Sequence, residues 1–403
     1  MAADAANEDD DEPTTAVANG AAASSLASST AGVSGQADVS EWSVSDVIKL
    51  DGHDSEVFVC AWHPLSNLLA TGSGDATARL WNVPVDRASP QQAAATAMAG
   101  VKVLRHVTNA NAKSRDVTTL DWNRTGSLLA TASYDGVARV WKPDGELVKE
   151  LAGHKGPIFA LKWNKAGTHL LSGSFDKSAV IWDVASGSMR QQFAFHTAPT
   201  LDVDWRTDTA FASCSTDKHI LVCELGRAAP LNDFTGHADE VNTITWDATG
   251  RLLASCSDDR TAKLWNCDAG GAVATFSEHT KEIYTIEWAP CGAGTANPGA
   301  RPLLASASFD ATIKLWDPES QQCVRTLAKH TDPVYSVSFS PDGQYLASGS
   351  LDKSVNVWSV RDGVLLRRYR GGSEILEVRW NSAGDRLAAC FADKSVVVLD
   401  LKK

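Results

Sequence analysis

The stretch TGSGDATARLW (residues 71–81) has seven related copies further along the chain, and together the eight copies decide the fold. In every copy an Asp stands six residues before a final position, which is Trp in six of the eight. The other copies are TASYDGVARVW (131–141), SGSFDKSAVIW (172–182), SCSTDKHILVC (213–223), SCSDDRTAKLW (255–265), SASFDATIKLW (306–316), SGSLDKSVNVW (348–358) and ACFADKSVVVL (389–399). A period near forty residues is typical of the blades of a β-propeller.

Each copy is preceded by a second conserved feature of the repeat, an aromatic residue that ends an alternating, β-branched stretch. These aromatic residues are Trp62, Trp122, Trp163, Trp205, Trp246, Trp288, Phe339 and Trp380. Turn signals such as Thr125-Gly126 follow them, and period-two runs such as 179–182 follow the Asp. The sequence therefore predicts an all-β fold, a closed eight-bladed propeller with four antiparallel strands per blade.

The repeats also fix the domain boundaries. Single blades cannot bury their faces alone, so residues 42–403 are expected to form one propeller. The chain ends on a third strand at 396–399, and residues 45–50 have the position of a fourth, outer strand that would close the last blade. Two long intervals between copies, around 83–101 and 291–302, are rich in Gly, Pro and Ala and are predicted to be surface loops.

Residues 1–41 differ in composition from the rest of the chain. They hold eight Asp or Glu and no Lys or Arg, which accounts for −8 of the net charge of −12. With hardly any large apolar residue, this acidic Ala/Ser-rich tail is predicted to be disordered, either simply solvated or in contact with a basic partner. The remaining −4 makes the propeller only mildly acidic, which argues against direct binding of duplex nucleic acid.

The eight cysteines are scattered and form no CxxC pair. They are interpreted as reduced, small hydrophobic residues of an intracellular protein in a reducing compartment, rather than as disulfides or metal ligands. No apolar run is long enough to span a membrane, and the N-terminus lacks the features of a secretory signal. No metal and no cofactor is expected.

Several residues make the chain resemble the WD40 family. Gly-His pairs stand before the repeats, as at 52–53, and Trp-Asp pairs end them at Trp182-Asp183 and Trp316-Asp317. Phrases such as DVTTLDWNRTGSLLATASYDG (116–136), HADEVNTITWDATGRLLASCSDD (237–259) and PVYSVSFSPDGQYLASGS (333–350) are similar to the transducin β-like 1 co-repressor subfamily, including its plant histone-deacetylase-associated branch.

This resemblance implies a nuclear protein that acts through protein partners. The subfamily carries an N-terminal LisH oligomerisation module and an F-box-like segment, and neither is recognised in the first 41 residues. Oligomerisation and the co-repressor contacts of that module are therefore not expected to transfer to this chain.

His, Ser, Asp and Trp recur together, but a set that occurs five times in one ring is not an active site, so no enzyme is predicted. The resemblance implies instead that each set is a hydrogen-bonded tetrad that ties a blade together. The predicted tetrads are His53, Ser73, Asp75 and Trp81; His154, Ser174, Asp176 and Trp182; His237, Ser257, Asp259 and Trp265; His279, Ser308, Asp310 and Trp316; and His330, Ser350, Asp352 and Trp358. Three blades are predicted to be incomplete, with Lys113 at the His position of blade two, Cys223 at the Trp position of blade four, and Gly371, Phe391 and Leu399 in blade eight.

Propellers of this kind bind partners on the face where the inner strands begin. The positions expected there lie six and four residues before each inner aromatic and one residue before each repeat Asp, and many are acidic or aromatic. The predicted partner-binding residues are Glu56, Phe58, Asp116, Tyr134, Phe159, Phe175, Glu240, Asn242, Asp258, Glu282, Tyr284, Phe309, Tyr335, Leu351 and Glu374. They suit a basic peptide, although charged residues at such positions can also be merely solvated.

Two functions remain open at this point. The first is a non-catalytic scaffold of a nuclear co-repressor and histone deacetylase complex, which binds histone tails or co-repressor segments on its narrow face. The second is a substrate receptor of a ubiquitin ligase. Such receptors often carry Trp-Asp closely followed by Arg, whereas Arg190 lies far beyond Trp182-Asp183, and Trp358-Ser359 with Arg361 is a partial match.

Overall fold

The alternating repeats form short antiparallel strands, and these strands form eight separate sheets. The structure is a computed structural model that describes residues 39–43, 46–84, 89–106, 116–292, 295 and 297–401. Most of the predicted tail, together with Ser45 and Lys113, lies outside these residues. Val39–Lys403 constitute one compact unit, to which the following description refers.

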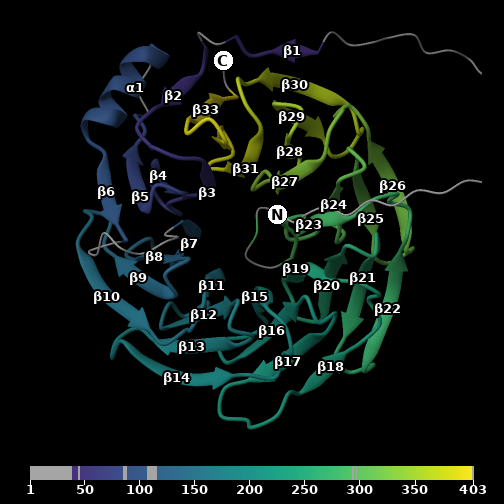
Figure 1. Cartoon of the computed structure of the whole chain (residues 1–403). Helices are drawn as coiled ribbons and strands as arrows, with labels where there is room; N and C mark the ends of the chain where they lie inside the picture. Colours follow the sequence, from purple (N-terminus) through teal and green to yellow (C-terminus); the bar gives the residue numbers. More distant parts are fainter. Residues whose placement is uncertain are drawn as a thin grey trace, which may run out of the picture. The chain divides into compact units, whose positions relative to one another are not determined.

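The eight sheets are the predicted blades, arranged around a central opening with the first strand of each blade innermost (Figure 1). Blades one to four are built from β3 (Val57–Trp62), β4 (Leu68–Ser73), β5 (Thr77–Asn82), β6 (Lys102–Arg105), β7 (Val117–Trp122), β8 (Leu129–Ser133), β9 (Val137–Trp141), β10 (Leu147–Ala152), β11 (Ile158–Trp163), β12 (His169–Ser174), β13 (Ala179–Asp183), β14 (Ser188–Phe193), β15 (Thr200–Trp205), β16 (Ala210–Ser215), β17 (Ile220–Glu224) and β18 (Asn232–Phe234). Blades five to eight are built from β19 (Val241–Trp246), β20 (Leu252–Ser257), β21 (Ala262–Asn266), β22 (Gly271–Phe276), β23 (Ile283–Trp288), β24 (Leu304–Ser308), β25 (Ile313–Asp317), β26 (Gln322–Leu327), β27 (Val334–Phe339), β28 (Tyr345–Ser350), β29 (Ser354–Ser359), β30 (Leu365–Arg370), β31 (Ile375–Trp380), β32 (Arg386–Phe391), β33 (Val396–Asp400) and, from the start of the chain, β2 (Ile48–Leu50). The predicted eight-bladed propeller is thereby confirmed.

The ring closes as predicted, because β2 pairs antiparallel with β33 and completes blade eight. The segment before β2 adds a feature that the sequence did not indicate. Strand β1 (Ser40–Glu41) pairs in parallel with β30 as a fifth strand of blade seven. Trp42 directly follows β1, and its indole N–H donates to the Asp400 carbonyl of β33 (3.0 Å). The guanidinium of Arg367, on β30, lies 4.0 Å from the Trp42 ring centre. The start of the described chain thus joins blades seven and eight.

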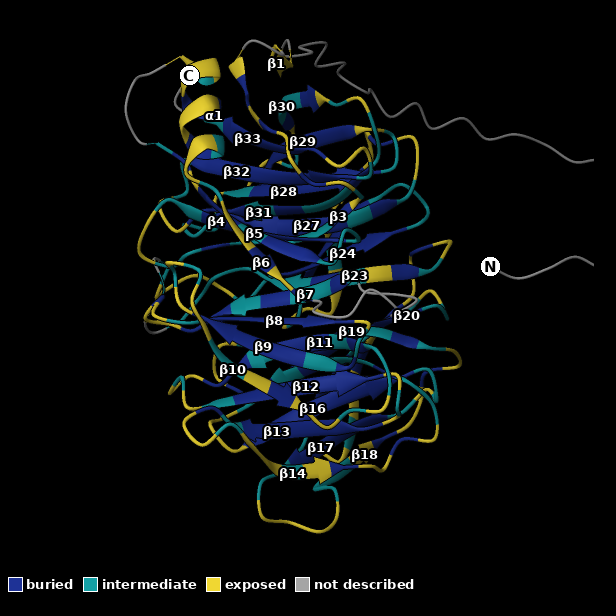
Figure 2. Ribbon diagram, turned by 60° about the vertical axis from the view of Figure 1, so that its left-hand side comes forward, coloured by how far each residue is buried: buried dark blue, intermediate teal, exposed yellow. Residues whose placement is uncertain are grey.

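Apolar side chains are buried between neighbouring blades. The Trp residues that end the third strands, such as Trp182 and Trp265, are almost completely buried. Figure 2 shows that the strands are largely buried, whereas the exposed residues lie mainly in loops, on outer strands and on the helix.

Neighbouring blades are also joined by hydrogen bonds from the inner aromatic residues. Six of these Trp indoles donate their N–H to an inner-strand carbonyl of the preceding blade, at 2.9–3.3 Å. Two blades depart from this pattern: the Trp246 N–H has no partner among the described residues, and Phe339 has no N–H to donate. The interfaces between blades four and five and between blades six and seven therefore lack this bond.

The prediction of a surface loop at 83–101 is wrong in part, because Pro90–Ala99 form the helix α1. Ser89 caps it by accepting the Gln92 backbone N–H, and Pro90 begins it. Ala93, Ala94 and Ala97 pack against Ile48 and other core residues of blades one and eight. Its buried side is made of Ala, which gives almost no amphipathic pattern, so the sequence signal for a helix is weak.

The tetrads contain a different hydroxyl from the predicted one. In blade five, His237 Nδ1–H donates to Asp259 (2.8 Å), and Nε2 accepts from Ser255 Oγ (2.7 Å), which itself accepts the Trp265 indole N–H (2.8 Å). The same arrangement uses Thr71, Ser172, Ser306 and Ser348 in blades one, three, six and seven. The predicted hydroxyls Ser73, Ser174, Ser257, Ser308 and Ser350 lie two residues later and instead accept the backbone N–H of the repeat Asp.

This error has a simple cause. Residues two apart in a strand point to the same face, so alternation cannot decide between Ser255 and Ser257. The strand register does decide: Leu253 pairs with Trp265, and Ser257 lies at the end of the strand beside the turn. Ser257 therefore bonds to the turn rather than to the indole.

The prediction for blade two is also corrected, because His106 occupies the His position. It lies sixteen residues before Trp122, whereas the spacing in blade one, from His53 to Trp62, is nine. Its Nε2 lies 2.7 Å from Thr131 Oγ1, while its Nδ1 accepts from Arg139, which also contacts Asp135. Burial and the nearby Arg139 lower the pKa of His106 to about 3, so this His is neutral.

Blades four and eight are incomplete in the structure. In blade four, His196 contacts Ser213 and Asp217, with Cys223 in the Trp position. In blade eight the Phe391 ring occupies the space above Gly371, where a Cβ would approach it to 2.3 Å. The Tyr369 ring packs against Phe391 at 6.4 Å, so apolar packing takes the place of the polar network.

We predict that Ser255→Ala destabilises the protein much more than Ser257→Ala. The first change leaves the buried Trp265 N–H and His237 Nε2 without partners and should cost roughly 2–4 kcal/mol. The second removes bonds at the strand end and should cost about 1 kcal/mol. Thermal and urea unfolding of both variants would test this difference, and equal losses would contradict the assignment of the tetrad hydroxyl.

Candidate peptide-binding face

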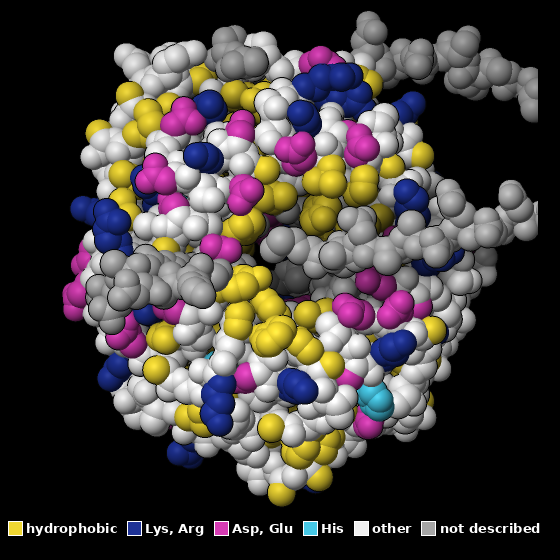
Figure 3. Space-filling model, viewed as in Figure 1, with side chains coloured by type: hydrophobic (Ala, Val, Ile, Leu, Met, Phe, Trp, Pro, Cys, Tyr) yellow, Lys and Arg dark blue, Asp and Glu magenta, His cyan; other side chains and the backbone are white. Residues whose placement is uncertain are grey.

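The predicted partner-binding residues lie on one face of the propeller, where the inner strands begin and the second strands end. We call this the binding face, and the face with the first-to-second-strand loops the opposite face. Figure 3 shows hydrophobic side chains gathered on two sides of the central opening, with Asp and Glu side chains close by. The residues form two aromatic patches and one acidic cluster.

The first aromatic patch consists of Tyr134, Phe159 and Phe175 in blades two and three. Their ring centres form a chain with separations of 6.1 and 6.3 Å, both in edge-to-face contact. Tyr134 and Phe175 remain 39% and 54% exposed, which is unusual for large aromatic side chains. Such a group of exposed rings is a feature of interaction sites.

The second aromatic patch consists of Tyr284, Phe309 and Tyr335 in blades six and seven. Their ring centres lie 4.7, 5.3 and 5.9 Å apart, and Phe309 is stacked with both tyrosines. The three rings pack against one another, so they form a continuous platform rather than an aromatic cage with space for an ammonium group. In a ring of eight blades, the two patches lie on opposite sides of the opening.

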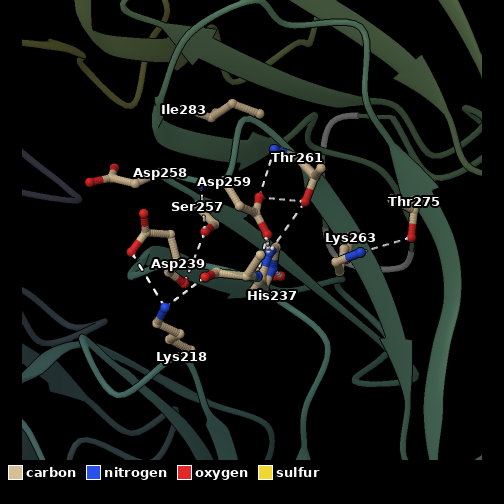
Figure 4. Close-up of polar contacts among 12 residues, drawn as sticks. Lys218, His237, Asp239, Ser257, Asp258, Asp259, Thr261, Lys263, Thr275 and Ile283 are labelled. Atoms are coloured by element: carbon tan, nitrogen blue, oxygen red, sulfur yellow. Dashed lines mark hydrogen bonds and ion pairs between the residues drawn. The ribbon is translucent and has the colours of Figure 1, made fainter.

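The acidic cluster consists of Asp239, Glu240 and Asp258 in blade five, and Glu282 stands at the position equivalent to Glu240 in the neighbouring blade six. Partial burial and the carboxylates of Asp258 and Asp239 raise the pKa of Glu240, with Lys218 opposing them. Lys218 Nζ is 3.9 Å from Asp239 and donates to the Ala238 carbonyl (Figure 4). One cation thus faces several carboxylates, and the cluster retains net negative charge.

Asn242 fixes the position of Asp258 in this cluster. Its side-chain amide donates to Asp258 Oδ1 (2.6 Å) and to the Ile283 carbonyl of the next blade (3.0 Å). Figure 4 shows Asp258 pointing away from the neighbouring His237–Asp259 pair, so its carboxylate is not part of the tetrad. The tetrad therefore holds the turn while the adjacent Asp faces outward.

The other predicted residues do not join these groups. Exposed Glu56 and half-buried Phe58 belong to blade one, half-buried Asp116 to blade two and Leu351 to blade seven. Glu374 in blade eight accepts from Ser373 Oγ, and this bond lowers the pKa of its carboxyl. The expected circle of carboxylates is thus interrupted: Pro occupies this position in blades three, four and seven, which leaves one acidic arc in blades eight, one and two and another in blades five and six.

Charged residues inside the central channel were missed by the sequence reasoning. They stand one or three residues before the inner aromatic: Asp121, Lys162, Asp202, Asp204, Glu287, Glu377 and Arg379. Several of the carboxylates accept inner-strand backbone N–H groups of the next blade, as in Asp204 with Trp246 (2.7 Å) and Glu377 with Cys60 (2.6 Å). An inner strand is a sheet edge, so these side chains satisfy N–H groups that its own sheet leaves unpaired.

The charges of the channel are only partly compensated. Lys162 Nζ lies 3.4 Å from Asp204 and 3.8 Å from Asp202. Burial opposes the charge of Lys162, but these carboxylates raise its pKa. Burial raises the pKa of Asp121 to about 7, although the Trp163 N–H and Lys162 favour its ionised form.

Across the part of the chain that the structure describes, no group of three or more His, Cys, Asp or Glu residues is arranged to hold a metal ion. None of the described helices has the length and apolar character needed to cross a membrane. All eight cysteines have free thiols.

Comparison with known proteins matches the family described as WD domain, G-beta repeat, to residues 45–82, 102–142, 145–183, 228–266, 270–317 and 321–359. The three inner strands of blades four and eight, whose third strands lack the terminal Trp, lie outside these segments. The F-box-like/WD repeat-containing protein TBL1X of Mus musculus is 52% identical over 358 residues, which cover 88% of this chain and 66% of that protein. The WD40 repeat-containing protein HOS15 of Arabidopsis thaliana is 54% identical over 359 residues, 89% of this chain and 58% of that protein.

Among solved structures, the C-terminal WD40 domain of Sif2 superposes with a TM-score of 0.74 at 25% identity and covers 88% of this chain and 97% of that domain. The chain spans two thirds or less of the length of the two relatives named above.

We predict that Asp121→Asn stabilises the protein more at pH 8 than at pH 5. The pKa of the Asp121 carboxyl, about 7, lies above its value of 3.8 in the unfolded chain, so its stabilising contribution is complete below pH 4 and is lost as the pH rises through 7. Asn keeps an acceptor for the Trp163 N–H and does not titrate.

Because Asp121 is only half-buried, the gain at pH 8 relative to pH 5 should be about 1–2 kcal/mol, less than the full pKa shift implies. Urea unfolding at several pH values would measure it, with exposed Asp268→Asn as the control. A pH-independent difference between Asp121→Asn and the natural chain would contradict the raised pKa.

Proposed function

The chain belongs to the WD40 family and, within it, to the transducin β-like 1 subfamily, and we propose that it is a protein-interaction scaffold that binds basic peptides on its binding face. The observation that carries this proposal is the acidic cluster around Glu240, whose charge Lys218 compensates only in part. Carboxylates that raise one another's pKa are stabilised when a cation approaches. A Lys or Arg side chain of a partner would supply that cation.

The two aromatic patches support the same kind of ligand. A peptide that crosses the central opening from blades two and three to blades six and seven would meet rings on both sides. The aliphatic stems of Lys and Arg pack on such rings, and their charged ends interact with ring faces. The acidic cluster lies beside the second patch, because Asn242 connects Asp258 to the Ile283 carbonyl, which is next to Tyr284.

The proposed setting is a nuclear co-repressor complex that contains a histone deacetylase. Membership of the subfamily supports this setting, and histone tails and co-repressor segments are partners of the required basic character. The proposal assigns no catalytic role to the chain, because its His-Asp pairs are engaged in buried tetrads.

A second candidate function is that of a substrate receptor of a ubiquitin ligase. The name of the mouse relative, an F-box-like/WD repeat-containing protein, favours this alternative. In this case the same binding face would take a substrate peptide. The partner recovered with the chain, rather than the geometry of the face, distinguishes the two roles.

We predict that Glu240→Lys combined with Glu282→Lys weakens binding of an unmodified, fluorescein-labelled histone-tail peptide at least about tenfold. The matched control is Asp268→Lys with Glu319→Lys, which makes the same charge change at exposed turns of the same two blades on the opposite face. Fluorescence anisotropy at two salt concentrations would measure both variants. Equal affinity of the two double variants would contradict the proposed site.

We further predict that the tagged chain recovers a histone deacetylase from nuclear extract, and that the Glu240→Lys, Glu282→Lys variant recovers fewer histones. Mass spectrometry of the purified complexes would identify the partners. Recovery of cullin-type ligase subunits without any deacetylase would favour the second candidate and refute the first.

A further inference from the structure

A cavity of about 640 Å³ opens on the opposite face, between blades six and seven. Its walls come from the loop between β23 and β24, which contains Ala289 and Leu303, and from the turns of blade seven around Gly343 and Val360. It is separate from the binding face, where the same two blades carry the second aromatic patch.

The small side chain of Ala289 lines this space and helps to leave it open. At two other interfaces the residue after the inner aromatic contacts the aromatic of the next blade: the His63 ring lies 4.9 Å from the Trp122 ring, and the Arg206 guanidinium 5.3 Å from the Trp246 ring. At the interface of blades six and seven, these positions hold Ala289 and Phe339, which pack in the same apolar cluster. Both the large first side chain and the indole are missing here.

The described part of the long loop of blade six forms one wall and bridges the two blades. The Asn297 side-chain amide donates to the Pro290 carbonyl of its own loop and to the Asp342 carbonyl of blade seven. These bonds connect the blades where Phe339 cannot donate an indole N–H. The wall therefore keeps the blades together without filling the cavity.

The cavity combines an apolar interior with basic groups at its mouth. Ala289, Leu303, Val360 and Leu366 supply apolar lining. The Arg361 side chain is 93% exposed, and its contact with Asp362 is long, at 3.9 Å. Exposed Arg301 makes no hydrogen bond or ion pair within the described residues.

The two aspartates at the mouth are already engaged in turns. Asp342 Oδ1 accepts from Ser340 Oγ and from the Gln344 backbone N–H. Asp362 Oδ2 accepts from Ser359 Oγ. The Asp362 side chain is nevertheless 59% exposed, so the mouth carries charges of both signs, and the arginines supply its cationic donors for a ligand's carboxylates.

We propose that this cavity is a second docking site, which takes one large apolar side chain of an acidic peptide segment from a partner protein. The apolar side chain would occupy space beside Ala289, at the position where His63 or Arg206 places a larger side chain elsewhere in the ring. Carboxylates that flank it in the peptide would pair with Arg301 and Arg361. This site would bind acidic segments, whereas the binding face would bind basic ones. The proposal of this second site does not depend on the proposed function.

The test uses the full chain and fluorescein-labelled synthetic peptides with one central tryptophan flanked by glutamates in a Gly-Ser background. We expect saturable binding of this peptide. Binding should be at least tenfold weaker when alanine replaces the tryptophan, and also when lysines replace the glutamates. Equal binding of the tryptophan and alanine peptides, or of the glutamate and lysine peptides, would overturn the proposal, as would no binding at all.

Two variants locate the binding. Arg301→Glu with Arg361→Glu should weaken it at least tenfold, whereas Arg251→Glu with Arg227→Glu, at exposed turns of the same face, should leave it unchanged. Ala289→Phe fills the cavity and should also abolish binding, with the melting temperature as a check of folding. An unlabelled histone-tail peptide should not compete with the acidic peptide. Competition would indicate that the acidic peptide binds on the binding face, and it would overturn the second site.

Discussion

The structure depends on a buried hydroxyl group in most blades that joins a histidine to a tryptophan. In blade five, Ser255 on the second strand connects the Trp265 indole on the third strand to His237, which precedes the inner strand. Because these groups are shielded from water, a missing partner would leave a polar atom unsatisfied, which is unfavourable in a low-dielectric interior. The network therefore fixes the loop before the inner strand, and with it the residues of the binding face.

The same network explains why the binding face is well defined although it consists of loops and strand ends. Asp259 accepts from His237 and from the Ala238 and Thr261 backbone N–H groups, so the turn has little freedom. Asp258, the residue before it, lies outside the tetrad and is half-buried, with its carboxylate held by Asn242. Blade eight lacks the network and uses Phe391 and Gly371 instead, which shows that apolar packing can hold the loop but supplies no polar anchor there.

The period and spacing of the repeats were sufficient to predict the blades, their number and the closing strand. Details that depend on register or on missing side chains were not predictable in this way. Ser255 and Ser257 point to one strand face, so only the pairing of Leu253 with Trp265 distinguishes them. His106 was missed because seven extra residues separate it from the inner Trp, and α1 because its buried side is alanine.

The acidic and aromatic positions of the candidate site were found by counting from the inner aromatic and from the repeat Asp, but their grouping was not. Grouping depends on which blades are neighbours, on the proline residues that interrupt the carboxylates, and on contacts such as that of Asn242 with Asp258. The channel carboxylates were missed for a related reason: their role is to satisfy N–H groups of the next blade, a contact that a single repeat does not contain.

Both proposed sites occur where the chain departs from its own repeat, and the fold allows them to have opposite charge preferences. The inner strands are six residues long, which separates the two faces by about 20 Å at 3.3 Å per residue. This distance exceeds the Debye length of about 8 Å at physiological ionic strength, so the arginines of one face hardly reduce the potential of the carboxylates on the other. A single propeller can therefore hold a basic and an acidic segment at the same time, as a scaffold that joins different partners requires.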